Sequence, residues 1–291
     1  MFFLFILINF FEPSVNSLLA FMKDAPVLVV VMAFFICWLG CWLPVAVVSA
    51  IALNFQPTKS LQPEQKLPLM VSLYLIAPLV LWGVMRFTNK SFSDYGLLVN
   101  ISLLGSLAFG FGLGVLSLAI MFSCQFLLGW CTWQKSNIKL IPPIFLPILL
   151  IALLVGGIEE LVFRGFLLTE LGRDYPFWLA AAISSLIFAV LHLVWEQRET
   201  IPQLFGLWLM GMMLVLARVA DGGNLGIAWG LHAALVWAIA TIDTAELITY
   251  TGKVSEWFTG KNKKPLAGVA GIVCVLGTSL ILWLFTRYFS T

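Results

Sequence analysis

Residues 149–168 read LLIALLVGGIEELVFRGFLL, a stretch as long as a membrane-crossing helix that still carries three charged side chains. A helix that spans the hydrocarbon core of a bilayer needs about 20 mostly apolar residues. Glu159, Glu160 and Arg164 interrupt this apolar run, and an ionised group in mid-membrane costs about 2.5–3.5 kcal/mol on insertion scales. Such residues usually face the interior of a helix bundle and serve a function. The stretch therefore predicts both a membrane environment and a candidate site.

The composition of the whole chain agrees with a membrane environment. Of the 291 residues, 61% are hydrophobic and 10% are charged, and the mean hydropathy is +1.02. Soluble domains carry about 25% charged residues, and disordered, coiled-coil and collagen-like chains need a polar or charged majority. The net charge of +2 gives no support for a nucleic-acid partner. We therefore predict an all-α fold, a polytopic membrane helix bundle.

Eight apolar runs are long enough to cross a bilayer. They cover residues 27–54, 67–86, 97–130, 143–170, 176–196, 201–219, 224–243 and 266–289. The first eleven residues, MFFLFILINFF, have no Lys or Arg before them and precede Glu12 and Pro13, so we expect an interfacial or re-entrant segment rather than a cleaved signal peptide. Nine Lys and Arg residues lie on the side of the loop 261–264 and six on the other side, which favours a cytoplasmic loop.

The charged triplet allows two interpretations. Glu160 and Arg164 share a helix face and are expected to pair, whereas Glu159 lies about 100° around the helix from Glu160 and is free to point elsewhere. The alternative is a structural ion pair near the helix end, with the Arg164 side chain reaching the membrane interface. Gly156 and Gly157 precede the triplet, and such a pair lets a neighbouring helix approach closely or lets its own helix bend.

The two histidines of the chain lie in two other apolar runs. His192 follows Phe188 by four residues, which places an aromatic ring beside the imidazole, and His232 lies in the run 224–243. A carboxylate and two imidazoles from three helices could together hold one water molecule or one metal ion. Taken alone, each histidine is equally consistent with a buried polar group whose hydrogen bonds are satisfied.

The order of these residues resembles the motifs of the CAAX protease and bacteriocin-processing family (CPBP), also called the Abi family. The pattern of that family reads Glu-Glu-x3-Arg, then Phe-x3-His, then His-x3-Asn/Asp. The chain matches the first two motifs in full, but Val236 takes the last position of the third. The resemblance predicts a division into N-terminal membrane helices of unknown role (1–142), a catalytic core (143–243), and an amphipathic loop with the final membrane helix (244–291).

The resemblance implies an intramembrane endopeptidase that hydrolyses a peptide bond of a membrane-associated protein. In this reading Glu159 and His192 activate water, and His232 stabilises the oxyanion. Glu160 orients or shares the site, with Arg164 and Phe188 in supporting positions. Valine has no hydrogen-bond donor, so Val236 removes one oxyanion contact, and the loss of one such donor typically costs about 10²–10³ in rate.

The sequence does not decide whether the protein binds zinc or no cofactor. Glu159, His192 and His232 match a catalytic zinc set in kind, although no HExxH motif is present. The expected partners are membrane lipid and a membrane-associated protein or peptide substrate. The segment Thr259–Gly268, TGKNKKPLAG, is similar to cyanobacterial and plastid-type members, which implies a multi-pass protein of a bacterial inner membrane or a plastid-type membrane.

Two other classes of function use the same residues. A non-catalytic scaffold or chaperone would keep the fold and bind a membrane partner without cleaving it, and Val236 favours this alternative. A proton-coupled transporter would use the buried glutamates and histidines as a relay. The sequence shows neither the internal repeats nor the paired broken helices that are typical of such transporters.

Overall fold

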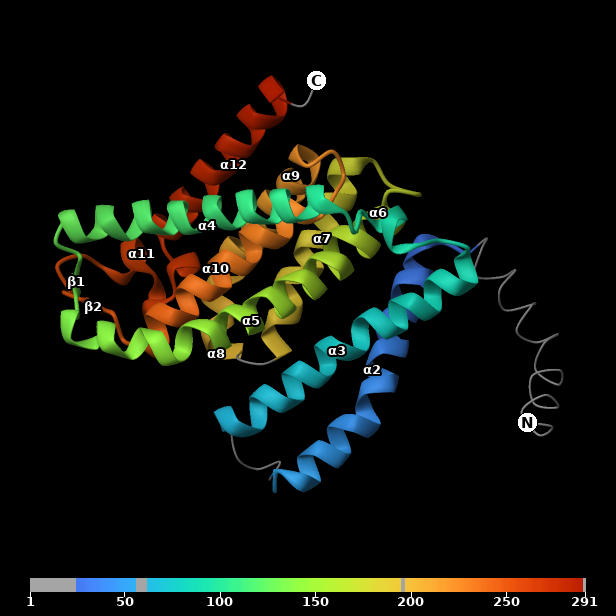
Figure 1. The fold of residues 1–291 in the computed structure, drawn as a ribbon, viewed down its shortest axis with the longest axis horizontal. Coiled ribbons are helices and arrows are strands. Elements are labelled where there is room, and N and C mark those ends of the chain that lie inside the picture. The colour runs from blue at the N-terminus through green and yellow to red at the C-terminus, as the bar shows by residue number, and fades with distance from the viewer. Residues whose placement is uncertain (1–24, 56–61, 195–196, 290–291) are drawn as a thin grey trace. The chain divides into compact units, whose positions relative to one another are not determined.

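The computed structural model describes residues 25–55, 62–194 and 197–289, and the statements below concern these residues. The predicted interfacial segment at residues 1–11 lies outside them. The described elements are mainly helical (Figure 1): α2 Val27–Ala52, α3 Pro63–Thr88, η1 Phe92–Tyr95, α4 Ile101–Leu127, β1 Cys131–Trp133, η2 Lys135–Leu140, α5 Ile141–Glu159, η3 Glu160–Leu167, α6 Leu168–Leu171, α7 Phe177–Leu191, η4 His192–Val194, α8 Gln197–Thr200, η5 Ile201–Gln203, α9 Leu204–Ala220, α10 Gly226–Thr244, β2 Ile248–Tyr250, α11 Glu256–Thr259, η6 Lys261–Lys263, η7 Pro265–Ala267 and α12 Val269–Phe289.

Within the described ranges, eight helical segments are long and apolar enough to cross a membrane. They are Val27–Ala52, Glu64–Arg86, Ile101–Leu127, Lys135–Leu171, Phe177–Val194, Gln197–Ala220, Gly226–Thr244 and Val269–Tyr288. Large apolar side chains such as Ile36 and Leu79 lie exposed on these helices, as expected where the surrounding solvent is lipid. The prediction of an all-α, multi-pass helix bundle is confirmed.

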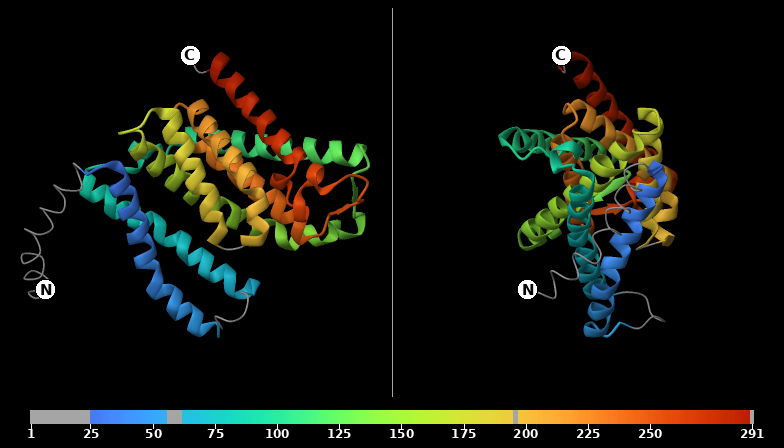
Figure 2. Two further views of the ribbon diagram at one scale, coloured as in Figure 1. Left: turned by 180° about the vertical axis from the view of Figure 1, so that it is seen from behind. Right: turned by 90° about the vertical axis from the view of Figure 1, so that its right-hand side faces the viewer.

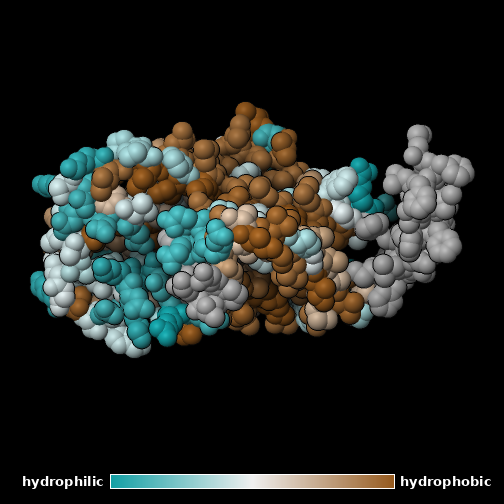
Figure 3. Space-filling model, turned by 90° about the horizontal axis from the view of Figure 1, so that it is seen from below, coloured by the Kyte–Doolittle hydropathy of each residue, from teal (hydrophilic) through white to brown (hydrophobic). Residues whose placement is uncertain are grey.

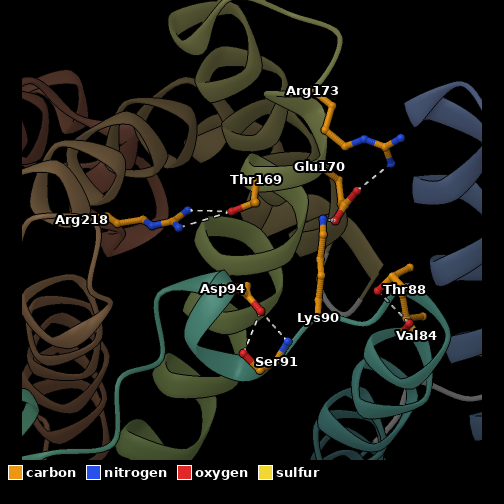
Figure 4. Close-up of polar contacts among 9 residues, drawn as sticks. All are labelled: Val84, Thr88, Lys90, Ser91, Asp94, Thr169, Glu170, Arg173 and Arg218. Carbon is orange, nitrogen blue, oxygen red and sulfur yellow. Dashed lines mark hydrogen bonds and ion pairs between the residues drawn. The ribbon is translucent and has the colours of Figure 1, made fainter. Parts of the chain in front are cut away.

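The described part of the chain divides into two compact units, and the first consists of residues 25–55, 62–94 and 170–174. Its helices α2 and α3 pack together, and Trp38 donates a hydrogen bond through Nε1 to the carbonyl oxygen of Leu73 at 2.8 Å. Glu170 is buried in this unit between two cations, Lys90 and Arg173 (Figure 4). The hydrogen bond of Trp38 and the ion pairs of Glu170 thus give partners to polar groups whose burial without a partner would destabilise the unit.

The second unit consists of residues 95–169, 175–194 and 197–289, and α10 is its central helix. This helix packs against α4, α5 and α9, and Figures 1 and 2 show it in orange among the other helices of the unit. Glycine permits the close approach of α4 and α10, because a Cβ atom at Gly230 would lie only 2.0 Å from the carbonyl oxygen of Leu107. This unit begins at residue 95, whereas the motifs place the start of the catalytic core at residue 143. The boundary at residue 143 therefore stays a prediction about function.

One end of the second unit is polar. There β1 and β2 pair antiparallel, with Cys131 opposite Tyr250 and Trp133 opposite Ile248. Figure 3 shows hydrophilic residues gathered at the end where Figure 1 places these strands. We call residues 128–140 and 245–268 the polar end, because they connect the ends of membrane helices and hold exposed lysines such as Lys135 and Lys261.

Candidate functional site

The glutamate motif lies where helix α5 changes its hydrogen-bonding pattern. Residues Glu160–Leu167 form a π-helix, in which each N–H bonds to the carbonyl five residues back instead of four. The apolar run expected over residues 143–170 thus contains a π-helical segment that begins at Glu160. Both glutamates face the same neighbouring side chain, His232 of α10.

Two glycines bring α5 close enough to α10 for this contact. A Cβ atom at Gly156 would lie 3.1 Å from the backbone nitrogen of Ala233, and one at Gly157 would lie 2.5 Å from Cε2 of Trp229. The indole of Trp229 also donates from Nε1 to the carbonyl oxygen of Leu153 at 2.8 Å. The close approach predicted for the Gly156–Gly157 pair is confirmed, and it places the start of the π-helix beside His232.

His232 lies between the two carboxylates. Its Nδ1 donates a hydrogen bond to Oε1 of Glu160 at 2.8 Å, and its Nε2 lies 3.4 Å from Oε2 of Glu159. The same Oε1 of Glu160 accepts a hydrogen bond from Nη1 of Arg164 at 3.0 Å, so the expected pairing of these two residues is confirmed. Arg164, Glu160, His232 and Glu159 thus form one continuous chain of charged and hydrogen-bonded groups.

This chain of groups is deeply buried. Glu160 and Arg164 are 0% exposed, His232 is 2% exposed and Glu159 is 6% exposed. Arg164 also donates from Nη2 to the carbonyl oxygen of Gly211 on α9 at 3.2 Å, so its guanidinium points into the bundle. The alternative in which Arg164 reaches the membrane interface is therefore wrong. Removing either partner of such a pair would leave an uncompensated buried charge, which is strongly destabilising.

Phe188 connects His192 to this chain of groups. Its ring, fully buried, lies 4.3 Å from Cζ of Arg164, a cation–π contact. The ring centroid also lies 4.6 Å from that of His192 and 5.8 Å from that of His232, both in edge-to-face arrangements. The predicted Phe188–His192 contact is confirmed. Nδ1 of His192 donates to the carbonyl oxygen of Phe188 at 2.8 Å, which leaves Nε2 with the lone pair when the ring is neutral.

The candidate zinc ligands are not gathered around one point. Among the residues that the structure describes, no group of three or more His, Cys, Asp or Glu side chains is placed to hold a metal ion. Both nitrogens of His232 face carboxylates, whereas Nε2 of His192 stays open. Glu159, His192 and His232 thus form no shared ligand set here, and no step below depends on a metal.

Val236 lies one turn beyond His232 on α10 and is half-buried. The neighbouring residue, Trp237, carries an indole N–H, and its ring packs against Phe111 and Phe145, with centroid distances of 5.6 and 5.1 Å.

The sequence-based reasoning missed the residues that hold the π-helix in place. Ser184 of α7 donates to the carbonyl oxygen of Phe163 at 2.8 Å, and Arg218 of α9 donates to the carbonyl oxygen of Arg164. Arg218 also contacts Oγ1 of Thr169 at 3.3 Å, as Figure 4 shows. Arg218 could have been suspected because it is a charged residue near the end of the apolar run 201–219. A charged residue at that position is equally typical of a helix end that lies in water.

Comparison with known proteins supports the motif assignment. Residues 141–238 match the family model described as "Type II CAAX prenyl endopeptidase Rce1-like". The chain is also 36% identical over 89 residues to an "Uncharacterized 24.3 kDa protein" of Escherichia coli, and the match covers 30% of this chain and 40% of that relative. No solved structure matches the chain. The resemblance to the CAAX protease family is thereby confirmed for the segment that contains every motif residue.

Proposed function

We propose that this chain is an intramembrane endopeptidase that hydrolyses a peptide bond of a membrane-associated protein. The observation that carries the proposal is the position of His232, whose two ring nitrogens each face one of two adjacent glutamates. These groups are buried among apolar helices, within the segment that matches the endopeptidase family. Positioned acids and bases of this kind transfer the protons of a hydrolysis.

Glu159 is the general base in this proposal. Its Oε2 lies 3.4 Å from Nε2 of His232, which is longer than the usual 2.7–3.2 Å of an N–H···O bond, so a water molecule can compete for the carboxylate. Glu159 takes a proton from that water while the water oxygen attacks the carbonyl carbon of the substrate. The proton then passes to the leaving nitrogen as the C–N bond breaks. Nε2 of His192 accepts a hydrogen bond from the second O–H of the water and so orients the molecule.

His232 stabilises the oxyanion that forms on the substrate. Glu160 accepts a hydrogen bond from Nδ1 of this ring, which fixes the orientation of the ring, and a proton on Nε2 then donates to the developing negative charge. Glu160 is itself held by Arg164. We therefore assign Glu160 and Arg164 as positioning residues, which act on the reaction through the orientation of His232.

Val236 supports a second candidate function. It stands where the family motif has Asn or Asp, so one donor to the oxyanion is missing. A chain that lost this donor could keep the buried groups for stability and bind a membrane protein without cleaving it. The two functions differ in a measurable property, because only the endopeptidase releases cleaved products.

The test compares the purified protein with its Glu159→Gln variant on a library of fluorogenic membrane-associated peptides. Glutamine keeps the size of the side chain but cannot accept the proton, and general-base catalysis contributes about 10²–10⁴ in rate. We expect cleavage to fall by that factor in the variant. Equal cleavage by both proteins would refute the assignment of Glu159, and intact binding without cleavage by the unmodified protein would identify the scaffold.

The matched control is Glu170→Gln. Glu170 is also a buried, ion-paired carboxylate, but it lies in the first compact unit and outside the motif residues. We expect this variant to cleave like the unmodified protein once both are shown to be folded and monodisperse. A similar loss in both variants would indicate that a buried carboxylate matters for folding and that the assay does not report on catalysis.

A further inference from the structure

The segment 259–268, TGKNKKPLAG, forms a tightly built loop that the proposed reaction does not use. Gly260, Asn262 and Lys263 have positive φ angles of 116°, 56° and 62°. Glycine adopts this conformation freely and asparagine does so more often than most residues, so the cost, of order 1–3 kcal/mol, falls mainly on Lys263. Such strain persists only where the surrounding structure enforces it, and it is common at ligand sites.

Close packing fixes this loop against its neighbours. A Cβ atom at Gly268 would lie 2.4 Å from the backbone nitrogen of Gly260, and one at Gly206 of α9 would lie 2.2 Å from the carbonyl oxygen of Leu266. The side chains of Thr259 and Pro265 are buried. The positions from which the lysines of the loop project are therefore set by the fold.

A hollow of about 470 Å³ lies beside this loop at the polar end. Its size falls within the roughly 300–1,000 Å³ that is usual for pockets that bind small molecules. The lining combines a cation, a hydroxyl group, a carboxylate, an indole and apolar side chains, contributed by Lys261, Ser255, Glu256, Trp257, Ile201, Pro202 and Ala267. Ala267 lies two residues before α12, so the hollow opens at the end of a membrane helix.

The cations of this region differ in what they contact. Lys264 pairs with Asp243 and Glu199 at 3.3 and 3.5 Å, and Lys253 donates to a backbone carbonyl. Among the described residues, Lys261 has no ion pair, and its side chain is exposed. The charge of Lys261 is thus available to a ligand in the hollow.

We propose that this hollow binds the phosphate group of a membrane phospholipid. Lys261 pairs with the phosphate, the hydroxyl group of Ser255 donates a hydrogen bond to it, and Ile201 with the 78% exposed Trp257 contacts the glycerol and the upper acyl chains. Tryptophan is enriched where a membrane meets water, and basic residues beside a membrane helix attract anionic lipids. The carboxylate of Glu256 opposes the anion and lowers the affinity.

The experiment measures lipid binding to the delipidated full-length protein in detergent. Short-chain phosphatidylglycerol is compared with diacylglycerol of the same chains, which lacks the phosphate, and inorganic phosphate serves as the competitor. We expect phosphatidylglycerol to bind at least tenfold more tightly than diacylglycerol. A basic residue near anionic lipid contributes about 1 kcal/mol, so Lys261→Gln should weaken binding about fivefold. Glu256→Gln should strengthen it, a gain that misfolding cannot produce.

Lys135→Gln is the matched control, because Lys135 is an exposed lysine of the same polar end that does not line the hollow. We expect its affinity to be unchanged. Equal binding of the two lipids, or equal losses from Lys261→Gln and Lys135→Gln, would overturn the proposal. Competition by inorganic phosphate supports recognition of the phosphate group alone, and its failure to compete supports recognition of the whole lipid. None of these outcomes depends on peptidase activity.

Discussion

Replacing Arg164 with methionine tests whether the buried chain of charges holds the second unit together. Methionine fills a similar volume but removes the guanidinium that lies 3.0 Å from Glu160 and 4.3 Å from the Phe188 ring centroid. Because Glu160 and Arg164 are both 0% exposed, water cannot compensate the charge that remains. Breaking a buried ion pair by removing one partner costs about 3–5 kcal/mol. Because the variant also loses the hydrogen bond to Gly211, we expect its loss in free energy of unfolding to lie near the upper end of that range.

The Arg164→Met/Glu160→Gln double variant separates the ion pair from the packing. Once Glu160 has lost its charge, the loss of the guanidinium leaves no unpaired buried carboxylate at that position. We therefore expect the double variant to be less destabilised than the sum of the two single variants. Residues in one network usually couple by 0.5–3 kcal/mol, and we expect about 2 kcal/mol here.

The assay is reversible unfolding in mixed detergent micelles with increasing dodecyl sulfate, followed by near-ultraviolet circular dichroism. All four proteins are measured under the same conditions, so that their free energies of unfolding can be compared in one cycle. A loss below about 1 kcal/mol for Arg164→Met would refute the cost assigned to a broken buried pair. Additivity of the two changes within about 0.5 kcal/mol would refute the coupling.

Three further predictions concern the missing donor, the helix contact and the polar end. Val236→Asn should raise the cleavage rate at least tenfold, since one oxyanion donor is worth about 10²–10³; an unchanged rate would show that another group supplies it. Gly230→Ala should abolish the folded protein in size-exclusion chromatography, because its Cβ would lie 2.0 Å from a backbone oxygen, whereas Gly112→Ala meets nothing within 4 Å and should fold normally. Burial raises the pKa of Tyr250 to about 12, so the phenol should ionise only above pH 11 in an ultraviolet titration that uses Tyr250→Phe as its reference. Its contribution to stability is fully present below pH 10, the pKa of an exposed tyrosine, and is lost as the pH rises to about 12.

The sequence was sufficient for the membrane class, for the number of spans among the described residues, and for naming the charged and aromatic side chains that meet around His232. These properties depend on local composition, because a run of about 20 apolar residues is informative wherever it occurs. The Glu160–Arg164 and Phe188–His192 contacts were also predictable, since each pair lies four residues apart on one helix. The scarcity of charge made the buried residues conspicuous.

The tertiary structure alone decided how these residues meet. The π-helix at Glu160–Leu167 is supported from other helices by Ser184 and Arg218, and the approach of α10 places His232 between the two glutamates. The glutamates leave the helix about 100° apart, and both reach His232 because each meets a different nitrogen of its ring. The sequence had also left open whether Arg164 reaches the interface, and only the packing of α5, α7, α9 and α10 buries it completely. Local periodicity identifies side chains that are placed unusually in an apolar run. It does not show which of them contact each other when they lie far apart in the chain.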